Sequence, residues 1–485
     1  MGRFMAERML KFVAVDRIPP AKRAPKARKA DFDEIYADFP VVAAAGQAAR
    51  CSQCGVPFCQ SHCPLSNNIP DWLKLSAEGR LQEAYELSAA TNPMPEICGR
   101  ICPQDRLCEG ACVIEQSGHG TVTIGAVEKH LTETAWREGW VAPIRPRRER
   151  PEHIGIVGAG PAGLTAAEAL RRRGYKVTIY DRYDRAGGLL IYGIPNFKLE
   201  KHVVARRVAR LEEGGVAFVL NCDVGRDVSL AELRARHDAL LIATGVYKAK
   251  ALGVPAAANA ALLAAMTYLT AANRVGLGDE VEAFTSGALD AKGKRVVVIG
   301  GGDTAMDCVR TAVRQGARSV TCLYRRDRAN MPGSRTEVDN AEEEGVRFEW
   351  LAAPRALIGD AKKMKAVRAV RMRLGAPDAS GRQSPEEAPD SAFDVPADLV
   401  IEALGFDADD LPTLWDEPEL ALSRWGTLKI DERTFATSLP GIYAAGDAVR
   451  GASLVVWAIK EGREAADGIH AMLEARAASA RVAAE

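Results

Sequence analysis

Eight of the eleven cysteines lie in two groups between Cys51 and Cys112. Each group contains a Cys-Pro step, and a Cys-Pro step also closes the cysteine run of bacterial ferredoxins. Eight thiolates are the number that two four-iron clusters need. Because such clusters carry single electrons, the pattern predicts that this chain conducts electrons. The expected cluster ligands are Cys51, Cys54, Cys59, Cys63, Cys98, Cys102, Cys108 and Cys112.

Zinc is the main alternative to iron–sulfur clusters, because a C-x2-C pair also opens many zinc ribbons. Only one such pair is present, Cys51 and Cys54, and the other intervals contain three, four or five residues. Disulfides belong mainly to exported proteins, and nothing in the sequence suggests export. The spacing therefore favours clusters. Cys222, Cys308 and Cys322 stand apart in apolar stretches and are expected to be core thiols.

A glycine-rich pattern occupies residues 153–181. An apolar run leads into G-x-G-x-x-G spacing that starts at Gly158, a helix-like stretch follows, and a second apolar run ends at Asp181. Such glycines permit a tight turn and a close approach to a pyrophosphate, the helix start adds positive charge, and the terminal acid accepts a hydrogen bond from a ribose. A dinucleotide site is predicted. Its expected residues are Gly158, Gly160, Pro161, Ala162, Gly163 and Asp181.

A second pattern of the same kind occupies residues 293–326, with Ala305 in the third glycine position. Here the second apolar run ends at Arg325 and Arg326 instead of an acid. A guanidinium can bind a 2′-phosphate, which a carboxylate would repel, so these arginines favour NADP over NAD. Arg328 is a less favoured third contact. The expected NADPH residues are Gly300, Gly302, Asp303, Thr304, Ala305, Arg325 and Arg326.

Two short motifs indicate that the first pattern binds FAD. LLIATG at 240–245 is an apolar run that ends in Thr244-Gly245, and LPGIYAAGDAV at 439–449 runs into Gly446-Asp447. A strand that presents an Asp to a ribitol chain, followed by a helix start facing a phosphate, suits FAD. The arrangement resembles the flavoprotein disulfide-reductase superfamily, which has two dinucleotide domains. No C-x4-C redox pair lies near the first pattern, so electrons must leave the flavin by another route.

Composition excludes several classes of protein. Lys plus Arg and Asp plus Glu each total 64, so no net charge favours nucleic acid. No stretch approaches the roughly 20 apolar residues of a membrane span, and Arg8 and Lys11 interrupt the only apolar start, so we expect a cytoplasmic protein. Two basic runs, within residues 1–30 and at 145–150, are either solvated segments or docking arms for an acidic partner surface.

The elements that would position these residues divide the chain into zones. Residues 69–90 and 123–136 have helical periodicity, so residues 1–145 are expected to form a helical domain with two [4Fe-4S] clusters. Beyond it, strand–turn–helix patterns predict an α/β fold with two Rossmann-like domains. The expected FAD-binding segments are 146–285 and 401–485, with an NADPH-binding domain inserted at 286–400. Residues 375–394 read as a surface hairpin or loop.

The combination of both cysteine groups, GAGPAG, AGGLLIYGIPNFKLEK at 186–201, GGGDTA and AAGD resembles the small (β) subunits of NADPH-dependent glutamate synthase over essentially the whole chain. The resemblance implies that FAD and two [4Fe-4S] clusters pass electrons from NADPH to a large (α) subunit. That partner, with FMN and a further iron–sulfur cluster, makes L-glutamate from L-glutamine and 2-oxoglutarate. Similar modules occur in dihydropyrimidine dehydrogenase.

The likeness to dihydropyrimidine dehydrogenase implies one grouping of the ligands. Cys63 would join Cys102, Cys108 and Cys112 at one cluster, and Cys51, Cys54 and Cys59 would hold the other, completed by either Cys98 or Glu128. Gly188 and Leu189 are expected beside the FAD. Lys198 is either a cation near the flavin or a solvated lysine. No catalytic acid or base is expected, because the cofactors carry out hydride transfer.

Two other functions stay open. One is a stand-alone NADPH:ferredoxin or other acceptor oxidoreductase. The other is a zinc-stabilised interaction module attached to a nucleotide-sensing domain without turnover. Iron and sulfide content would separate the second from an electron-conducting enzyme.

Overall fold

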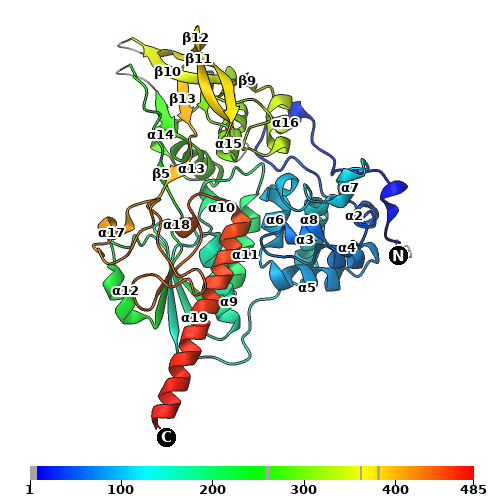
Figure 1. The fold of residues 1–485 in the computed structure, drawn as a ribbon, viewed down its shortest axis with the longest axis vertical. Coiled ribbons are helices and arrows are strands. Elements are labelled where there is room, and N and C mark those ends of the chain that lie inside the picture. Colours follow the sequence, from blue (N-terminus) through cyan, green and yellow to red (C-terminus); the bar gives the residue numbers. More distant parts are fainter. Residues whose placement is uncertain (1–7, 258–260, 361–362, 379–382, 485) are drawn as a thin grey trace.

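The computed structural model describes residues 8–257, 261–360, 363–378 and 383–484. Figure 1 shows a helical lobe beside two stacked α/β units, the upper of which carries an antiparallel hairpin. The expected α/β class, with a helical N-terminal domain and two Rossmann-like units, is confirmed. Within the described ranges, no helix combines the length and apolar character that crossing a bilayer requires.

The N-terminal lobe is built from short helices around its own core. Both stretches with helical periodicity are helical, and Gly79, at φ +78°, separates the two helices that 69–90 forms. Trp72 and Val127 are fully buried in the core of the lobe. The helices are α1 (Pro25–Arg28), α2 (Val41–Ala48), α3 (Phe58–Ser61), α4 (Ile69–Ala77), α5 (Leu81–Thr91), α6 (Pro95–Ile101), α7 (Val113–Gln116) and α8 (Ile124–Arg137).

The first α/β unit has a five-stranded parallel sheet in the order β15-β4-β1-β2-β3. Because β15 joins from the far end of the chain, two separate segments build this unit. Its strands are β1 (His153–Val157), β2 (Lys176–Tyr180), β3 (Val216–Val219), β4 (Ala239–Ile242) and β15 (Ile442–Ala444). Its helices are α9 (Pro161–Arg172), α10 (Leu189–Tyr192), α11 (Lys201–Glu213), α12 (Leu230–Arg236), α17 (Leu411–Leu414), α18 (Asp447–Arg450) and α19 (Val455–Ala484).

The second unit has a parallel sheet in the order β6-β13-β7-β8-β9. Its strands are β6 (Leu262–Ala264), β7 (Arg295–Ile299), β8 (Ser319–Tyr324), β9 (Arg347–Trp350) and β13 (Leu399–Glu402). Its helices are α13 (Ala265–Gly276), α14 (Glu282–Thr285), α15 (Asp303–Arg314) and α16 (Arg335–Glu343).

The second unit begins earlier than the expected boundary at residue 286. The strand β6 pairs with β13 in the second sheet, although it lies within the segment 146–285 that we assigned to the FAD domain. The chain crosses between the units at β5 (Lys248–Ala249) and returns at β14 (Phe406–Asp407), and these two strands pair with each other. We therefore propose the boundaries at β5 and β14, because sheet membership changes there.

An antiparallel sheet covers one side of the second unit. It consists of β10 (Ala352–Gly359), β11 (Met364–Pro377) and β12 (Gln383–Pro396). The segment 375–394, read as a hairpin or loop, forms the outer part of the β11–β12 hairpin, and its residues 379–382 lie outside the described ranges.

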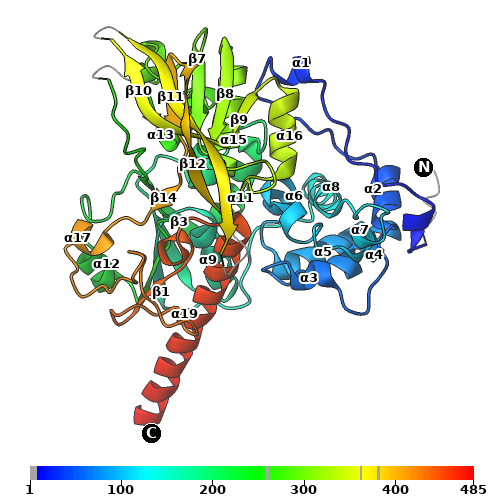
Figure 2. The ribbon, with the colours of Figure 1, turned by 45° about the horizontal axis from the view of Figure 1, so that its top comes forward.

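The basic N-terminal segment docks on its own chain. Lys22 Nζ lies 2.7 Å from Glu343 and donates to Asn340 of α16. The Arg28 guanidinium is fully buried and pairs with Glu343 and Glu344. Figure 2 shows this segment crossing from the N-terminal lobe to α16. Two basic side chains of this segment, Lys22 and Arg28, therefore have acidic partners on the second unit of the same chain.

Candidate functional site

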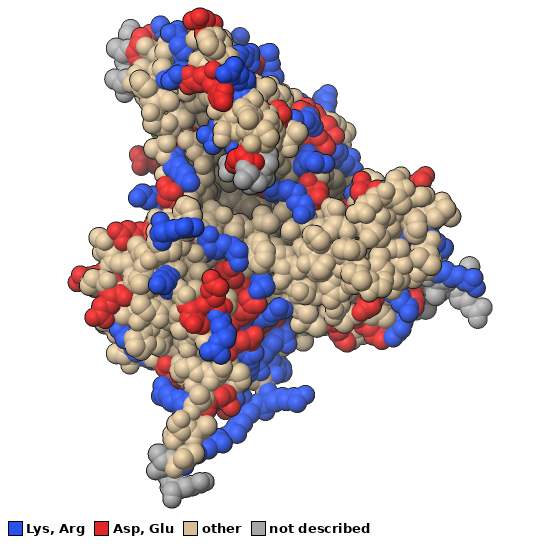
Figure 3. Space-filling model, viewed as in Figure 1, with Lys and Arg blue, Asp and Glu red and all other residues tan. Residues whose placement is uncertain are grey.

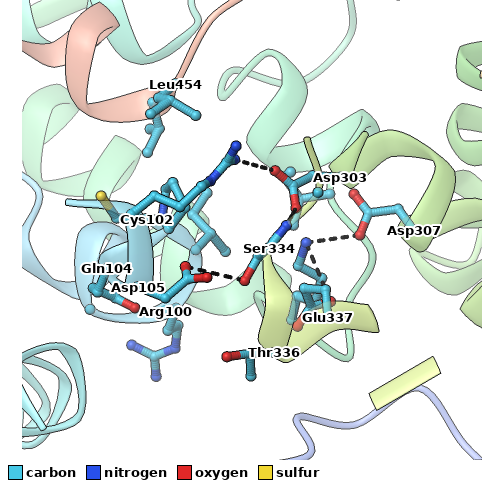
Figure 4. A pocket seen from close by; sticks show the side chains of 18 of the residues that line it. Arg100, Cys102, Gln104, Asp105, Asp303, Asp307, Ser334, Thr336, Glu337 and Leu454 are labelled. Carbon is cyan, nitrogen blue, oxygen red and sulfur yellow. Dashed lines mark hydrogen bonds and ion pairs between the residues drawn. The ribbon is translucent and has the colours of Figure 1, made fainter. Parts of the chain in front are cut away.

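The three parts of the chain meet around one cavity of about 1220 Å³. The first glycine pattern, the second glycine pattern and the loop around Cys102 all line it, and Figure 4 shows side chains from the N-terminal lobe facing Asp303 and Ser334 of the second unit. The expected residues in its lining are Gly158, Gly160, Pro161, Ala162, Asp181, Gly188, Leu189, Lys198, Thr244, Gly245, Asp303, Thr304, Asp447 and Cys102. Residues that lie far apart in the sequence therefore share one space.

The three glycines of the first pattern have different packing. A Cβ at Gly158, where φ is +111°, would lie 2.3 Å from the Ala243 carbonyl oxygen, and one at Gly163 would lie 2.0 Å from the Gly158 oxygen. A Cβ at Gly160 would meet no atom within 4 Å. The outer two glycines are therefore required by the fold, whereas Gly160 leaves space open at the start of α9. That open space suits a pyrophosphate at a helix N-terminus.

Asp181 fixes the glycine turn through its carboxylate. It accepts hydrogen bonds from the Ala159 N–H at 2.7 Å and from the Tyr183 N–H at 2.9 Å. Burial raises the pKa of Asp181, although these two N–H groups oppose the rise. The carboxylate lies at the end of β2 and lines the cavity, where a ribose contact stays a prediction.

The remaining FAD candidates gather on the same side of the cavity. The Thr244 hydroxyl is buried and has no hydrogen-bond partner among the described residues, which suits a ligand group. Asp447 accepts from the Ser453 hydroxyl at 3.0 Å, and burial raises its pKa to about 6. Gly446 has φ +73° and packs on Ala162. Gly188, also at positive φ, packs on Gly160.

The second pattern repeats this geometry. A Cβ at Gly300 would lie 2.3 Å from the Ala403 oxygen, and one at Gly302 would meet no atom within 4 Å. Asp303 accepts from the Ser334 N–H at 2.9 Å, and Ala305 is fully buried beneath the turn. A second open cradle therefore lies at the start of α15.

Arg325 and Arg326 directly follow β8, next to this cradle. Neither makes an ion pair with any residue in the described ranges, and the buried Nε of Arg326 has no hydrogen-bond partner there. Arg328 is instead engaged by Asp339 and Glu342. The two expected arginines are thus available for a phosphate, and the third is occupied.

Lys198 lines the cavity but faces the second unit. Its ammonium lies 2.9 Å from Asp307 of α15 and 3.6 Å from Glu337 of α16. Burial lowers the pKa of Lys198, but these carboxylates outweigh it and raise the pKa overall. Its side chain is only 10% exposed, so the solvated alternative does not hold.

The eight cysteines form two sets, which differ from the grouping implied by the resemblance. Cys51, Cys54, Cys59 and Cys112 line one small cavity in the N-terminal lobe. Burial, followed by the neighbouring Cys51 and Cys112, raises the pKa of Cys59 to about 12. We call these four residues the outer set. Cys112 therefore occupies the place for which Cys98 and Glu128 were candidates.

The other four, which we call the inner set, lie toward the first α/β unit. The inner set comprises Cys63, Cys98, Cys102 and Cys108. Burial and then Cys102 raise the pKa of Cys98, with Cys63 also contributing. Cys98 belongs to the same hydrophobic core as Leu190 of α10, and Cys102 lines the shared cavity.

Glu128 lies beside the inner set and not the outer one. Its carboxylate accepts hydrogen bonds from Asn92 at 3.2 Å and from Ser88 at 3.5 Å, and burial raises its pKa to about 8. Glu128 contributes to the raised pKa values of Cys98 and Cys102. If each set of four cysteines held one cluster, Glu128 would not be needed as a ligand.

Two contacts of the site had no signal in the sequence. Arg106 Nη2 lies 3.5 Å from Asp303, which starts the helix of the second pattern. Arg207 of α11 forms a buried pair with Glu96 of α6, at 2.6 Å. Because the partners are 197 and 111 residues apart, no local pattern links them. The buried Arg207–Glu96 pair joins the cysteine-bearing lobe to the first unit, and the more exposed Arg106–Asp303 contact links it to the second.

Two family models match the chain. Dihydropyrimidine dehydrogenase domain II, described as a 4Fe-4S cluster domain, matches residues 28–140. The pyridine nucleotide-disulphide oxidoreductase family matches residues 152–462. The first match supports iron–sulfur over zinc for the cysteine lobe, and the second covers both α/β units.

Whole-chain relatives extend the match. The glutamate synthase [NADPH] small chain of Azospirillum brasilense is 62% identical over 480 residues, covering 99% of each chain. The putative oxidoreductase AegA of Escherichia coli is 46% identical, covering 93% of this chain and 69% of that protein. The structure of Mycobacterium tuberculosis FprA in complex with NADPH, at 20% identity and a TM-score of 0.57, shares the fold over 68% of this chain and 86% of that chain. The chain belongs to the family of glutamate synthase [NADPH] small chains.

Proposed function

We propose that this chain oxidises NADPH through FAD and sends the electrons through two [4Fe-4S] clusters to a large glutamate synthase chain. The observation that carries the proposal is the shared cavity of about 1220 Å³, in which both glycine patterns and Cys102 face one another. When bound, FAD takes a hydride from NADPH and releases electrons one at a time to iron–sulfur clusters. The protein supplies position and electrostatics.

Residues of both glycine patterns would hold the two dinucleotides on either side of the shared cavity. The open cradle at Gly160 and the unpartnered Thr244 hydroxyl suit FAD, and the cradle at Gly302 suits NADPH. Arg325 and Arg326 are available for the 2′-phosphate. The Lys198–Asp307 pair holds the second unit against the first, and the Arg106–Asp303 contact links the N-terminal lobe to the second unit, which keeps the two sites facing each other.

The positions of the two cysteine sets support an order for the electrons. The inner set would hold the cluster nearer the flavin, because Cys102 lines the cavity with Leu189. The outer set lies within the core of the N-terminal lobe and does not line the shared cavity. Electrons would therefore pass from the flavin to the inner cluster and then to the outer one.

The outer set lies next to an exposed apolar loop. Val56 and Phe58, between Cys54 and Cys59, are 65% and 45% exposed, and Phe58 also lines the outer cysteine cavity. Figure 3 shows few charged side chains on the face of this lobe turned to the viewer. Exposed apolar side chains that lie next to one another on a face with few charges are typical of interaction sites. We place the large chain, with its FMN and iron–sulfur cluster, against this loop.

A stand-alone NADPH:acceptor oxidoreductase is the second candidate. It is favoured by the 46% identity to a putative oxidoreductase that is not named as a glutamate synthase. The cavity and cysteine sets would serve either acceptor equally. The cytoplasmic location and the lack of nucleic-acid or membrane partners stay predictions.

The test is to produce the chain with and without its large partner, anaerobically, and to analyse metal, sulfide and flavin. We expect about eight irons and one FAD per copy of this chain in the complex, beyond the cofactors of the partner. NADPH should reduce an artificial acceptor with or without the partner, and glutamate should form only with it. Glutamate production by the single chain, or zinc in place of iron, would refute the proposal.

A further inference from the structure

The basic run at residues 145–150 forms one wall of a second cavity, of about 1210 Å³. The end of α5, the end of α9 and the last turns of α19 form the other walls. Segments separated by hundreds of residues therefore bring their arginines to the same cleft. In Figure 3, Lys and Arg side chains gather between the projecting α19 helix and the N-terminal lobe.

Positive charge exceeds negative charge in this cleft. Eight arginines and four glutamates line it. The arginines are Arg145, Arg147, Arg148, Arg150, Arg172, Arg173, Arg210 and Arg481, and the glutamates are Glu86, Glu149, Glu152 and Glu474. Four of the arginines already have partners, since Arg150 pairs with Glu474, Arg172 and Arg210 with Glu168, and Arg173 with Asp467.

The other four arginines have no ion-pair partner within the described parts of the chain. They are Arg145, Arg147, Arg148 and Arg481, and all four are exposed. An arginine fork binds a carboxylate through two parallel hydrogen bonds. Exposed like charges that converge repel one another, and an incoming anion would relieve that repulsion. The cleft therefore fits a ligand with several negative charges.

The C-terminal end of α19 is a second argument for a large anionic ligand in this cleft. Figures 1 and 2 show this helix leaving the body of the protein, and residues 478–482 are exposed. A helix end that makes no tertiary contacts has little stability of its own in water. Arg481 on this end lines the cleft, so one bound molecule could contact the arginines and the helix together.

We propose that this cleft binds an acidic segment of a partner protein. A single phosphate is too small to reach four arginines spread over a cavity of about 1210 Å³. A lipid surface is flat, whereas these arginines line a hollow. The floor also includes the apolar side chains of Trp140 and Ile144, which a peptide could cover and a simple anion could not. The site lies apart from the electron path and does not depend on it.

The experiment measures binding of a fluorescein-labelled oligoglutamate peptide to the full chain by anisotropy. We expect salt to weaken binding, and Arg147→Gln/Arg148→Gln to raise Kd about tenfold. Arg481→Glu alone should also raise Kd, because Arg481 lies on α19, in a different wall of the cleft from Arg147 and Arg148. The matched control is Arg318→Gln/Arg347→Gln, which removes two exposed arginines of the second unit that make no ion pair with described residues. This control should change Kd less than twofold.

NADPH oxidation with an artificial acceptor should be unchanged in every variant, which shows that each one is folded. Equal weakening of peptide binding by Arg147→Gln/Arg148→Gln and by the control variant would overturn the proposal. So would displacement of the peptide by inorganic phosphate at the peptide's own concentration, which would indicate a small-anion site. Binding of phosphatidylserine vesicles but not of the peptide would also overturn it.

Discussion

The Lys198 ammonium lies 2.9 Å from the Asp307 carboxylate, and this pair joins the two dinucleotide units at the edge of their shared cavity. Lys198 comes from the loop before α11 and Asp307 from α15, and their side chains are 10% and 4% exposed. Burial raises the pKa of Asp307 to about 6, against the opposing effect of Lys198. Each group therefore depends on the other to remain charged in the interface.

Removing both partners of this pair should cost less than the sum of removing each one alone. Lys198→Met leaves Asp307 buried without its closest cation, and we expect a loss of about 3 kcal/mol in the free energy of unfolding. Asp307→Asn should cost a similar amount, and the double variant much less than the sum. Chemical denaturation of the four proteins measures the coupling. Strictly additive losses would show that the two groups do not interact.

Arg325 and Arg326 should determine the choice of nucleotide. Replacing both with Gln removes the charges available for a 2′-phosphate, so we expect KM for NADPH to rise at least tenfold and KM for NADH to change less than twofold. Arg328→Gln is the control, because that side chain is held by Asp339 and Glu342. Steady-state kinetics with both nucleotides decides. If the ratio of KM for NADPH to KM for NADH were unchanged in the double variant, Arg325 and Arg326 would not be the contacts of the 2′-phosphate.

Lys201 should make stability depend on alkaline pH. Its buried ammonium donates to the carbonyls of Leu190 and Ile194, and burial lowers its pKa from 10.5 to about 7. Between these values the unfolded chain binds the proton and the folded chain does not, so stability should rise with pH across this window. Lys201→Met should lack this rise. Thermal unfolding of both proteins at pH 7 and pH 10 measures the change in stability. An equal change in the two proteins would contradict the role of Lys201.

The exposed loop between Cys54 and Cys59 should be needed for docking. Val56→Asp adds a charge at a side chain that is 65% exposed, so folding should be unaffected while binding of the large chain weakens at least tenfold. Trp425→Asp is the control, since Trp425 is 73% exposed in the first unit. Copurification and calorimetry with the large chain measure the effect. Equal affinity of both variants would place the interface elsewhere.

The sequence predicted those features that depend on local spacing. The glycine turns at Gly158 and Gly300 and the helices of the N-terminal lobe occupy the expected places, because turn geometry and periodicity act within a few residues. The convergence of both turns with Cys102 on one cavity also agrees with the expected electron path.

Features set by contacts between distant segments could not be predicted. Cys112 joins Cys51 instead of Cys102 because helix packing, and not spacing, decides which thiols meet. Arg28 docks on α16 through Glu343, a residue 315 positions away, and the charge run alone could not identify that partner. The entry of β6 into the second sheet depends on its pairing with β13, in which Leu262 pairs with Val400, 138 positions away.

The most direct test of the electron path is the Cys102→Ser variant in complex with the large chain. NADPH-driven glutamate formation should fall at least 100-fold, because the inner cluster loses a ligand, while reduction of an artificial acceptor at the flavin stays within twofold. Glutamate formation driven by dithionite should persist and show that the partner is intact, and Cys222→Ser is the matched control. Retention of NADPH-driven glutamate formation in Cys102→Ser would contradict the path from flavin to inner cluster.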